Sequence, residues 1–270
     1  MRAKIWGCRG SLATPGEATV RYGGNTSCVE LHAPGGGLVI LDAGTGIRAL
    51  GHKVHANGAR DADLLLTHLH LDHVEGLGFF EPLFDPEFTL RVWGPRPDGG
   101  PLQQQLSVYL SPPFFPMPFD EIPATIEFTE VERDRWTIAG MTVTTAPVHH
   151  RGPTVGYRLE EGARSMAFIP DNEPGLDPES GLELAGGAEV LFHDAQYTEE
   201  EYKTRVGWGH TSLPDYARYV TAAAPGRAVM FHHDPEHSDW QLEEMRALAC
   251  ELTGRDEIEL AHEGMSVTIE

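Results

Sequence analysis

The histidine-rich segment 67–73 constrains this chain more than any other feature of its sequence. It reads Thr-His-Leu-His-Leu-Asp-His and directly follows an apolar run of leucines. Alternate residues of an extended segment share one face, so His68 and His70 can bind the same metal ion. Asp72 and His73 come just after, where a turn can aim them at a second ion. A motif this dense occurs by chance in roughly 0.002 chains of this composition, which argues against an incidental surface turn.

Two metal ions need further ligands, and three other segments offer suitable side chains directly after predicted strands. His149 and His150 form one pair, Asp171 stands alone, and His232 and His233 form a second pair. Sheet scaffolds commonly carry their sites on strand ends, so these side chains are expected to converge with the histidine motif. A carboxylate between two divalent ions can bridge them. The pattern itself leaves open which histidine of each pair binds metal.

Short apolar and β-branched runs bounded by Gly, Pro, Asn and Asp predict a chain rich in strands. The strands come in groups with helices between and after them, which favours two mixed β-sheets packed face to face and flanked by helices. This αββα sandwich belongs to the α/β (α+β) class. Because no linker-like tract interrupts the 270 residues, we expect a single domain over residues 1–270. The predicted strands are Ala3–Trp6, Ser27–His32, Leu38–Leu41, Asp63–Thr67, Thr89–Trp93, Ala124–Glu130, Trp136–Ala146, Thr154–Leu159, Ser165–Ile169, Glu189–Phe192, Ala228–Phe231 and Met265–Ile269, and the predicted helices are Gly46–Asn57, Gln103–Leu110, Leu213–Ala223 and Asp239–Leu252.

The last of these helices has the clearest pattern. Ser238 can cap its N-terminus, and its apolar residues repeat with helical spacing. The apolar face of this helix consists of Leu242, Met245, Leu248, Ala249 and Leu252.

Phe79, Phe80 and Phe84, which follow the histidine motif, are expected to pack in the core rather than to stack on a nucleobase.

The charge balance narrows the partners that this chain can have. Its 20 Lys and Arg residues against 41 Asp and Glu residues give a net charge of −21. A chain this acidic repels polyanions unless basic residues are concentrated somewhere, and no run of Lys or Arg is present. Long nucleic acid and anionic membranes are therefore poor partners. With neither a signal-peptide pattern, nor an apolar run that could cross a bilayer, nor a cysteine framework, we expect a cytoplasmic protein.

Further motifs accompany the histidine segment along nearly the whole chain. They include Trp-Gly-Cys-Arg-Gly-Ser at 6–11, Tyr-Gly-Gly-Asn-Thr-Ser-Cys at 22–28, Leu-Asp-Ala-Gly-Thr-Gly at 41–46, Val-Gly-Tyr at 155–157, Pro-Asp-Asn at 170–172, Gly-His-Thr-Ser at 209–212 and Phe-His-His-Asp-Pro at 231–235. With them the chain resembles the metallo-β-lactamase fold superfamily, and within it the phosphodiesterase branch that includes ribonuclease Z and bacterial cyclic-nucleotide phosphodiesterases. The histidine motif is typical of the superfamily, and its combination with Gly-His-Thr-Ser points to phosphodiester cleavage.

The resemblance implies a metallo-β-lactamase fold with two metal ions and seven ligands. It favours His150 over His149 because His150 lies seven residues before Tyr157, as in the family. His232 is preferred to His233 because it directly follows the apolar strand. Two Zn²⁺ ions per chain are the expected cofactors, and Mn²⁺ or iron would also suit a site with two carboxylates. The implied ligands of one ion are His68, His70 and His150, those of the other are Asp72, His73 and His232, and Asp171 bridges the two.

The resemblance also implies roles for residues around the ions. Asp42 is similar to the family's acid that orients the histidine loop, although it could instead cap the helix predicted after it. His210 would support the scissile phosphate or protonate the leaving oxygen, because an alkoxide leaves poorly without a proton. The alternative for His210 is an incidental histidine in a helix-capping turn. Asp72 and His210 are thus the predicted catalytic residues, and Asn25, Ser27 and His210 the predicted substrate-binding residues.

The implied function is hydrolysis of a small phosphodiester by a hydroxide held between the ions, with a 3′,5′-cyclic nucleotide as the preferred candidate. Ribonuclease Z-like tRNA 3′ processing is an alternative, but such enzymes hold tRNA with a basic arm, and no basic insertion lies between Asp171 and His210. An acyl or lactone hydrolase on the same fold would have less need of the Gly-His-Thr-Ser motif. A binding or regulatory protein without the reaction is a third alternative. The resemblance also suggests a homodimer.

Overall fold

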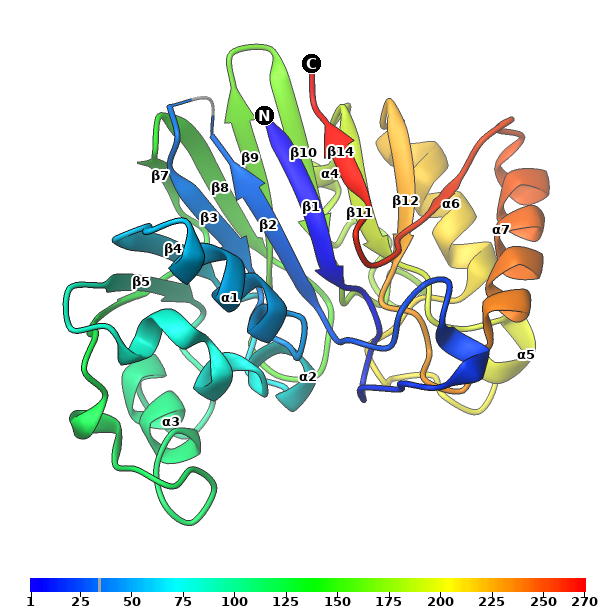
Figure 1. The fold of residues 1–270 in the computed structure, drawn as a ribbon. Coiled ribbons are helices and arrows are strands. Elements are labelled where there is room, and N and C mark those ends of the chain that lie inside the picture. Colours follow the sequence, from blue (N-terminus) through cyan, green and yellow to red (C-terminus); the bar gives the residue numbers. More distant parts are fainter. Residues whose placement is uncertain (34) are drawn as a thin grey trace.

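Two seven-stranded β-sheets pack face to face between two layers of helices in the computed structural model (Figure 1). The structure describes residues 1–33 and 35–270. The layer order of helices, sheet, sheet and helices confirms the αββα sandwich and the α/β class predicted from the sequence. None of the helices in these ranges has the length and apolar character needed to cross a bilayer.

The first sheet is antiparallel on one side and parallel on the other. Strands β14, β1, β2 and β3 run antiparallel to their neighbours, whereas β3, β4, β5 and β6 run parallel. Apolar residues of three helices pack on its outer face. In sheet order the strands are β14 (Ser266–Thr268), β1 (Arg2–Gly7), β2 (Cys28–His32), β3 (Leu38–Leu41), β4 (Asp61–Leu65), β5 (Thr89–Gly94) and β6 (Thr125–Glu130), and the helices are α1 (Ile47–Ala56), α2 (Leu71–Val74) and α3 (Leu102–Tyr109).

The second sheet has the same mixed character. Strands β13, β12, β11 and β10 are parallel, and β10, β9, β8 and β7 are antiparallel. Helices α4, α6 and α7 pack on its outer face. In sheet order the strands are β13 (Glu259–Leu260), β12 (Arg227–Phe231), β11 (Val190–Asp194), β10 (Arg164–Ile169), β9 (Val155–Glu161), β8 (Met141–Pro147) and β7 (Arg135–Ile138), and the helices are α4 (Leu182–Ala185), α5 (Glu199–Tyr202), α6 (Leu213–Ala223) and α7 (Asp239–Thr253).

The alternation of side chains along each strand divides the core into three layers. Strand β3 shows the principle, because all four of its residues are buried. Val39 and Leu41 belong to the layer between the sheets, whereas Leu38 and Ile40 belong to the layer beneath α1. Successive residues of a strand point to opposite faces, so a strand covered on both faces is apolar throughout.

One predicted strand is a hairpin in the structure. The segment predicted as continuous over Trp136–Ala146 consists of β7 and β8, joined by a turn at Ala139 and Gly140. Both turn residues have positive φ angles, +50° and +81°, and glycine adopts this region without steric cost. The sequence prediction also missed β13 and the helices α2, α4 and α5, which have two to four residues each and are too short for a periodic pattern.

Helix α7 follows the prediction at its start but not along its whole apolar face. Ser238 accepts a hydrogen bond from Gln241 N–H and forms the expected N-terminal cap. Leu248 and Leu252, however, remain 42% and 45% exposed, because the helix buries a narrower stripe of residues against the sheet.

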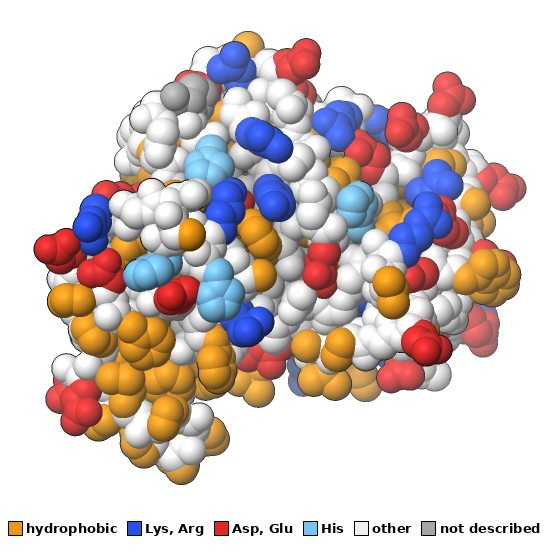
Figure 2. Space-filling view, in the orientation of Figure 1, with side chains coloured by type: hydrophobic (Ala, Val, Ile, Leu, Met, Phe, Trp, Pro, Cys, Tyr) orange, Lys and Arg blue, Asp and Glu red, His pale blue; other side chains and the backbone are white. Residues whose placement is uncertain are grey.

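Apolar side chains gather on the surface beside α3 and the segment after it (Figure 2). Phe80 is buried as predicted, but Phe79 and Phe84 are exposed, so their predicted place in the core is wrong. Phe115 packs edge-on against Phe79, with ring centroids 6.4 Å apart. The loop around Phe115 therefore packs against the short helical turn Leu77–Phe79 that follows the histidine motif.

Candidate metal centre

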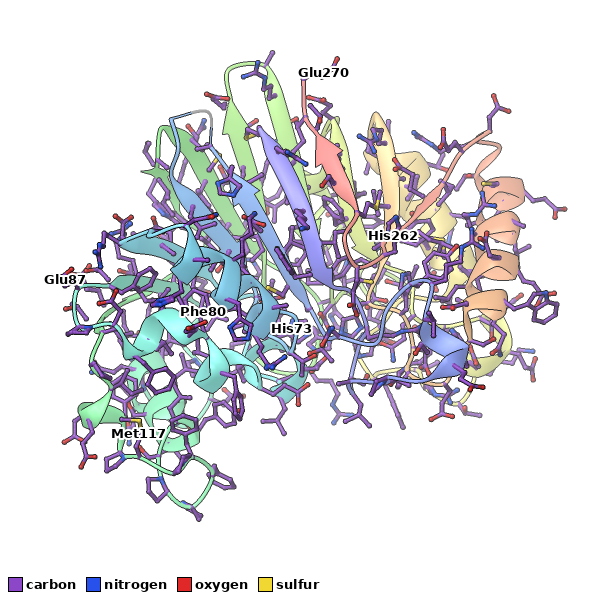
Figure 3. All side chains as sticks on the ribbon, viewed as in Figure 1. His73, Phe80, Glu87, Met117, His262 and Glu270 are labelled. Atoms are coloured by element: carbon purple, nitrogen blue, oxygen red, sulfur yellow. The ribbon has the colours of Figure 1, made fainter. Side chains whose placement is uncertain are left out.

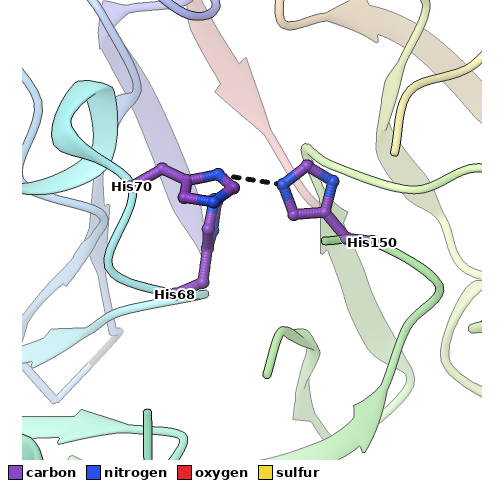
Figure 4. A group of neighbouring side chains, drawn as sticks. All are labelled: His68, His70 and His150. Carbon is purple, nitrogen blue, oxygen red and sulfur yellow. Dashed lines mark hydrogen bonds between the residues drawn. The ribbon is translucent and has the colours of Figure 1, made fainter. Parts of the chain in front are cut away.

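The histidine motif runs from the end of β4 into the first turn of α2. The chain stays extended through His70, with φ −63° and ψ 149°, and α2 begins at the next residue. His68 and His70 therefore share a face, as predicted, with ring centroids 4.4 Å apart. His150 approaches them from the loop after β8, and its Nε2 lies 3.0 Å from Nδ1 of His70 (Figure 4). These three side chains form the first candidate ligand group.

A second candidate ligand group joins the first turn of α2 to the end of β12. His73 Nε2 lies 3.2 Å from Asp72 Oδ2 and 3.3 Å from His232 Nε2. His232 Nε2 in turn lies 3.1 Å from Asp72 Oδ2. His232 has a positive φ of 57°, a region that few histidines adopt. Such backbone strain persists where the surrounding structure enforces it, and it is concentrated at functional sites.

Asp171, which follows β10, lies between the two groups. Its Oδ2 is 3.2 Å from His73 Nε2, and its Oδ1 is 3.2 Å from His232 Nε2 and 3.8 Å from His150 Nε2. The carboxylate thus contacts members of both groups, which is the placement that a bridging ligand needs. The structure brings together all seven side chains predicted as ligands (Figure 3 shows His73 near the lower ends of the strands).

Hydrogen bonds at the outer ring nitrogens fix the orientation of three of these histidines. When Nδ1 of an imidazole donates its proton outward, the lone pair lies on Nε2, and here each Nε2 faces the cluster. The three Nδ1 donors are those of His73 to Asp42 Oδ2 at 2.7 Å, His150 to the Gly209 carbonyl at 2.7 Å, and His232 to Gln196 Oε1 at 2.9 Å.

Two buried atoms of the cluster have no hydrogen-bond partner within the described ranges. They are His68 Nε2 and Asp171 Oδ2. A buried polar atom without a partner is costly unless something else satisfies it. Lone pairs of several histidines and carboxylates converge on one space, and they are the ligand types that Zn²⁺ and related divalent cations prefer. The residues present therefore fit a metal site.

The electrostatics of the cluster keep its carboxylates ionised. Burial alone would raise the pKa of Asp171, but His232 and His73 outweigh it and hold that pKa well below its usual range. Burial lowers the pKa of His150 to about 4, so this ring is neutral near pH 7. Burial opposes the charged form of His232 too, but Asp171 and Asp72 raise its pKa to about 9. A bound cation would replace the proton on such a ring, since a metal ligand must be deprotonated.

Asp42 is fully buried behind the histidine motif and orients it. Its carboxylate accepts hydrogen bonds from Thr67 N–H at 2.8 Å, from His73 Nδ1 at 2.7 Å and from the Ser27 hydroxyl at 2.9 Å. No side chain caps α1, so the helix-cap alternative for Asp42 does not hold. Because the Ser27 hydroxyl is buried against Asp42, Ser27 supports this acid and does not face a substrate, contrary to its predicted role.

The other predicted substrate-binding residue, Asn25, is half-buried beside the loop after β1. Its backbone N–H donates to Glu263 Oε1 at 2.7 Å, and its carbonyl accepts from Cys8 and Arg9. Among the described residues, no hydrogen bond joins its side chain to the histidine cluster.

The histidine left over in each pair points elsewhere. His149 is exposed, and its backbone contacts Ser180. His233 is buried, and its Nε2 lies 2.9 Å from the Ala261 carbonyl. His262 lies apart from the cluster, between β13 and β14 (Figure 3). His150 and His232, the favoured member of each pair, are thus the ones whose side chains enter the cluster.

His210 lies at the edge of the cluster and is held by an acid. Its Nδ1 is 2.9 Å from Asp194 Oδ2 and 3.7 Å from Asp171 Oδ1. Its ring stacks on that of His232, with centroids 4.9 Å apart. The cap of α6 is Ser212, whose side chain accepts a hydrogen bond from Asp215 N–H. His210 is therefore free of the capping role that was the alternative to a functional one.

Asp194, the partner of His210, was not among the residues predicted for the site. Asp194 ends β11, so the rule that placed Asp171 and His232 at strand ends would also have found it. Its neighbour His193 points the other way, stacks on Tyr219 with ring centroids 4.1 Å apart, and is a buried packing residue.

The loop after β1 also lies against the cluster. Ser11 N–H donates to Asp72 Oδ2 at 2.7 Å. A Cβ atom on Gly10 would lie 2.2 Å from Nδ1 of His232, so only glycine fits there. Gln196, which accepts from His232 Nδ1, is fully inside the molecule and was likewise not predicted. Close packing of this kind depends on segments that are far apart in the chain.

Comparison with known proteins agrees with this geometry. The profile of the Beta-lactamase superfamily domain matches residues 38–233, which include the seven candidate ligands. The chain belongs to the metallo-β-lactamase superfamily and is a hydrolase of that superfamily. Its relatives include ribonuclease Z of Mycolicibacterium paratuberculosis, which is 30% identical over 248 residues, or 83% of this chain and 86% of the relative.

Solved structures show the same fold. Zn²⁺-bound PqqB from Methylobacterium extorquens aligns with a TM-score of 0.73 and 18% identity over 99% of this chain and 100% of that one. A diphosphatase from the PhnP family aligns with a TM-score of 0.70 and 18% identity over 100% of this chain and 98% of that one. The predicted metallo-β-lactamase fold is thereby confirmed.

Proposed function

We propose that this chain is a binuclear metal-dependent phosphodiesterase that cleaves a small phosphodiester, with a 3′,5′-cyclic nucleotide as the preferred substrate class. The observation that carries the proposal is the position of His210, which Asp194 holds at 2.9 Å beside the seven candidate ligands. A phosphodiester with an alkoxide leaving group needs a proton donor there, whereas an activated ester does not.

Each group of the chain then has a chemical task. Two divalent cations, with Zn²⁺ as the first choice, would neutralise charge on the phosphate and activate water. Asp72 and Asp171 supply the anionic ligands, and the neutral rings of the cluster supply the nitrogen ligands. The bond from His210 Nδ1 to Asp194 leaves Nε2 to donate a proton to the leaving oxygen as the P–O bond breaks. Asp194 stabilises the positive charge that the ring carries before this transfer, and the ring becomes neutral when Nε2 has given up its proton.

The preference for a small substrate rests on charge. With a net charge of −21, the chain repels a long polyanion, whereas cations in the pocket attract a single phosphate. The chain between Asp171 and His210 contains no basic insertion that could hold tRNA. The diphosphatase of the PhnP family, a neighbour in fold, is consistent with a small phosphorylated substrate.

One specific observation favours a second candidate. Curated relatives at 28–30% identity are named ribonuclease Z, so tRNA 3′ processing is the alternative activity. An acyl or lactone hydrolase is less well supported, because the Asp194–His210 pair would have little to do in that reaction.

A substrate panel on zinc-loaded protein tests the proposal. The panel contains 3′,5′-cyclic AMP, bis(p-nitrophenyl) phosphate, a precursor tRNA and a lactone. We expect both small phosphodiesters to be hydrolysed, and H210A to lower turnover of the cyclic nucleotide by roughly 10²- to 10⁴-fold. Efficient tRNA cleavage without cyclic-nucleotide turnover would favour the ribonuclease Z alternative. Lactone turnover that is unchanged in H210A would favour the acyl hydrolase.

A further inference from the structure

Glu173 is a buried acid that the proposed reaction does not use. It lies two residues after Asp171 and is 1% exposed. Its Oε1 accepts hydrogen bonds from Gly207 N–H at 2.6 Å and from the Tyr202 hydroxyl at 2.8 Å. Its Oε2 accepts from Gly209 N–H at 2.6 Å. Burial of a carboxylate is costly, and three well-aligned donors offset that cost.

The loop that Glu173 holds carries contacts to both halves of the site. The Gly209 carbonyl accepts the hydrogen bond from His150 Nδ1 at 2.7 Å, and the next residue is His210. Gly207 and Gly209 have φ angles of +80° and +93°, which favour glycine. The loop also packs closely against His150, because a Cβ atom on Gly209 would lie 2.2 Å from Nδ1 of that ring.

The backbone around Glu173 is tied to the same two segments. Glu173 N–H donates to the His149 carbonyl at 2.8 Å. The Thr211 hydroxyl donates to the Asn172 carbonyl at 2.6 Å. The turn after β10 is thus bonded on one side to the residue before His150 and on the other to the residue after His210.

We propose that Glu173 is a positioning residue that fixes His150 and His210 relative to each other. It acts through the Gly207 and Gly209 amides and does not touch the substrate. The proposal rests on the proposed function, because the effect is read out at the leaving oxygen that His210 serves. When the loop is displaced, His210 no longer lines up with that oxygen, and His150 loses the acceptor that orients its ring.

Glu173→Gln tests the proposal with little change in shape. A Gln side chain would point an NH₂ group at one of the glycine amides, so one donor would lose its acceptor. We expect kcat for 3′,5′-cyclic AMP to fall roughly 10- to 100-fold, because its alkoxide leaving group depends on His210. With zinc at a concentration that saturates both proteins, turnover of bis(p-nitrophenyl) phosphate should change less than about 3-fold, because p-nitrophenolate leaves without a proton.

Two control variants separate positioning from general disturbance. Glu179→Gln changes an exposed acid in the same segment and should leave both rates unchanged. Tyr202→Phe removes one donor from Glu173 but leaves both glycine amides bound, and should have a smaller effect than E173Q. A purely structural role of Glu173 would instead lower both rates by the same factor.

Zinc affinity gives a second readout that does not depend on turnover. We expect E173Q to weaken the binding of at least one ion roughly 10-fold, measured by competition with a chromogenic chelator. This readout decides the proposal even if the wild-type protein hydrolyses no phosphodiester. If E173Q fails to fold, Glu173→Asp keeps the charge but shortens the reach to the two amides, and the same losses are expected. A folded variant with wild-type zinc affinity and an unchanged ratio of the two rates would overturn the proposal.

Discussion

At the scale of single residues, the candidate ligands are oriented by hydrogen-bond acceptors that lie behind them. Each accepts a hydrogen bond from the Nδ1 of one ring: Asp42 from His73, Gln196 from His232, and the Gly209 carbonyl from His150. Each acceptor decides which ring nitrogen faces inward, and ligand geometry at metal sites depends on such partners.

Asp42→Asn is expected to weaken metal binding at the Asp72, His73 and His232 group. The amide of Asn cannot accept from Thr67, Ser27 and His73 at once, because one of its two polar atoms is a donor. We expect the affinity for one Zn²⁺ to fall by roughly 10- to 100-fold. The measurement is metal content after dialysis against graded chelator. Ser27→Ala, which removes a single donor, is the matched control, and a loss as large as that of D42N would contradict this account.

At the scale of elements, the loop after β1 joins the two sheets at the site. Arg9 forms isolated bridges with Thr26 on one side and with His233 on the other. Gly10 follows, and a Cβ atom on this residue would lie 2.2 Å from Nδ1 of His232. The loop therefore links the first sheet to His232, a candidate ligand that follows a strand of the second sheet.

Gly10→Ala is expected to abolish full metal occupancy. The added methyl group would lie 2.2 Å from Nδ1 of His232 and must displace the ring or the loop. Gly16→Ala in the same segment meets no atom within 4 Å and serves as the control. Metal analysis of both purified variants provides the check. If G10A still bound two ions per chain, the loop after β1 would have moved to accept the methyl group without displacing His232, and the expectation would be wrong.

The elements show which features local sequence can reveal. Strands such as β3, helix α6 and the cap of α7 have bounds set by their own residues, and the predictions matched them. The histidine motif and the strand-end rule located the segments that carry the seven candidate ligands for the same reason, and the family's spacing then favoured His150 over His149. The hairpin turn at Ala139 and Gly140 was missed because apolar residues run through it. Gln196 and Glu173 were missed because their partners lie far away in the sequence, whereas Asp194 stands at a strand end, where the strand-end rule should have found it.

At the scale of the whole molecule, two buried histidines make the fold sensitive to acid. Burial lowers the pKa of His193 to about 4 and the pKa of His233 to about 3. An unfolded chain takes up these protons below about pH 6.5, whereas the folded chain does not. The unfolded state therefore binds more protons between those values, and stability decreases as the pH falls through this window.

His193→Gln is expected to reduce this acid sensitivity. Each such histidine contributes a slope of about 1.4 kcal/mol per pH unit between roughly pH 4 and 6.5. The free energy of unfolding of the variant should thus fall less steeply with pH than that of the wild type, as measured by urea titration at several pH values. His52→Gln, at an exposed site, is the control. Equal slopes for H193Q and the wild type would contradict the role assigned to burial.

The candidate ligands come from both sheets, so metal binding should stabilise the assembled sandwich. His68, His70, Asp72 and His73 follow β4 of the first sheet, whereas His150, Asp171 and His232 follow strands of the second. At a free zinc concentration 100 times the dissociation constant, binding to the folded state alone adds about 2.7 kcal/mol. We expect EDTA to lower the thermal midpoint of the wild type and to leave that of D171N nearly unchanged. If EDTA shifted the thermal midpoint of both proteins equally, metal binding at this site would not be what stabilises the fold.

A metal site whose ligands come from both sheets has a consequence for the protein in the cell. When the bound metal ion is scarce, a larger fraction of the chains would be unfolded and open to proteolysis, so the amount of protein should fall together with its activity. A shortage of the metal ion would then lower activity by removing the protein itself. Restoring the ion would bring activity back only after new protein had been synthesised.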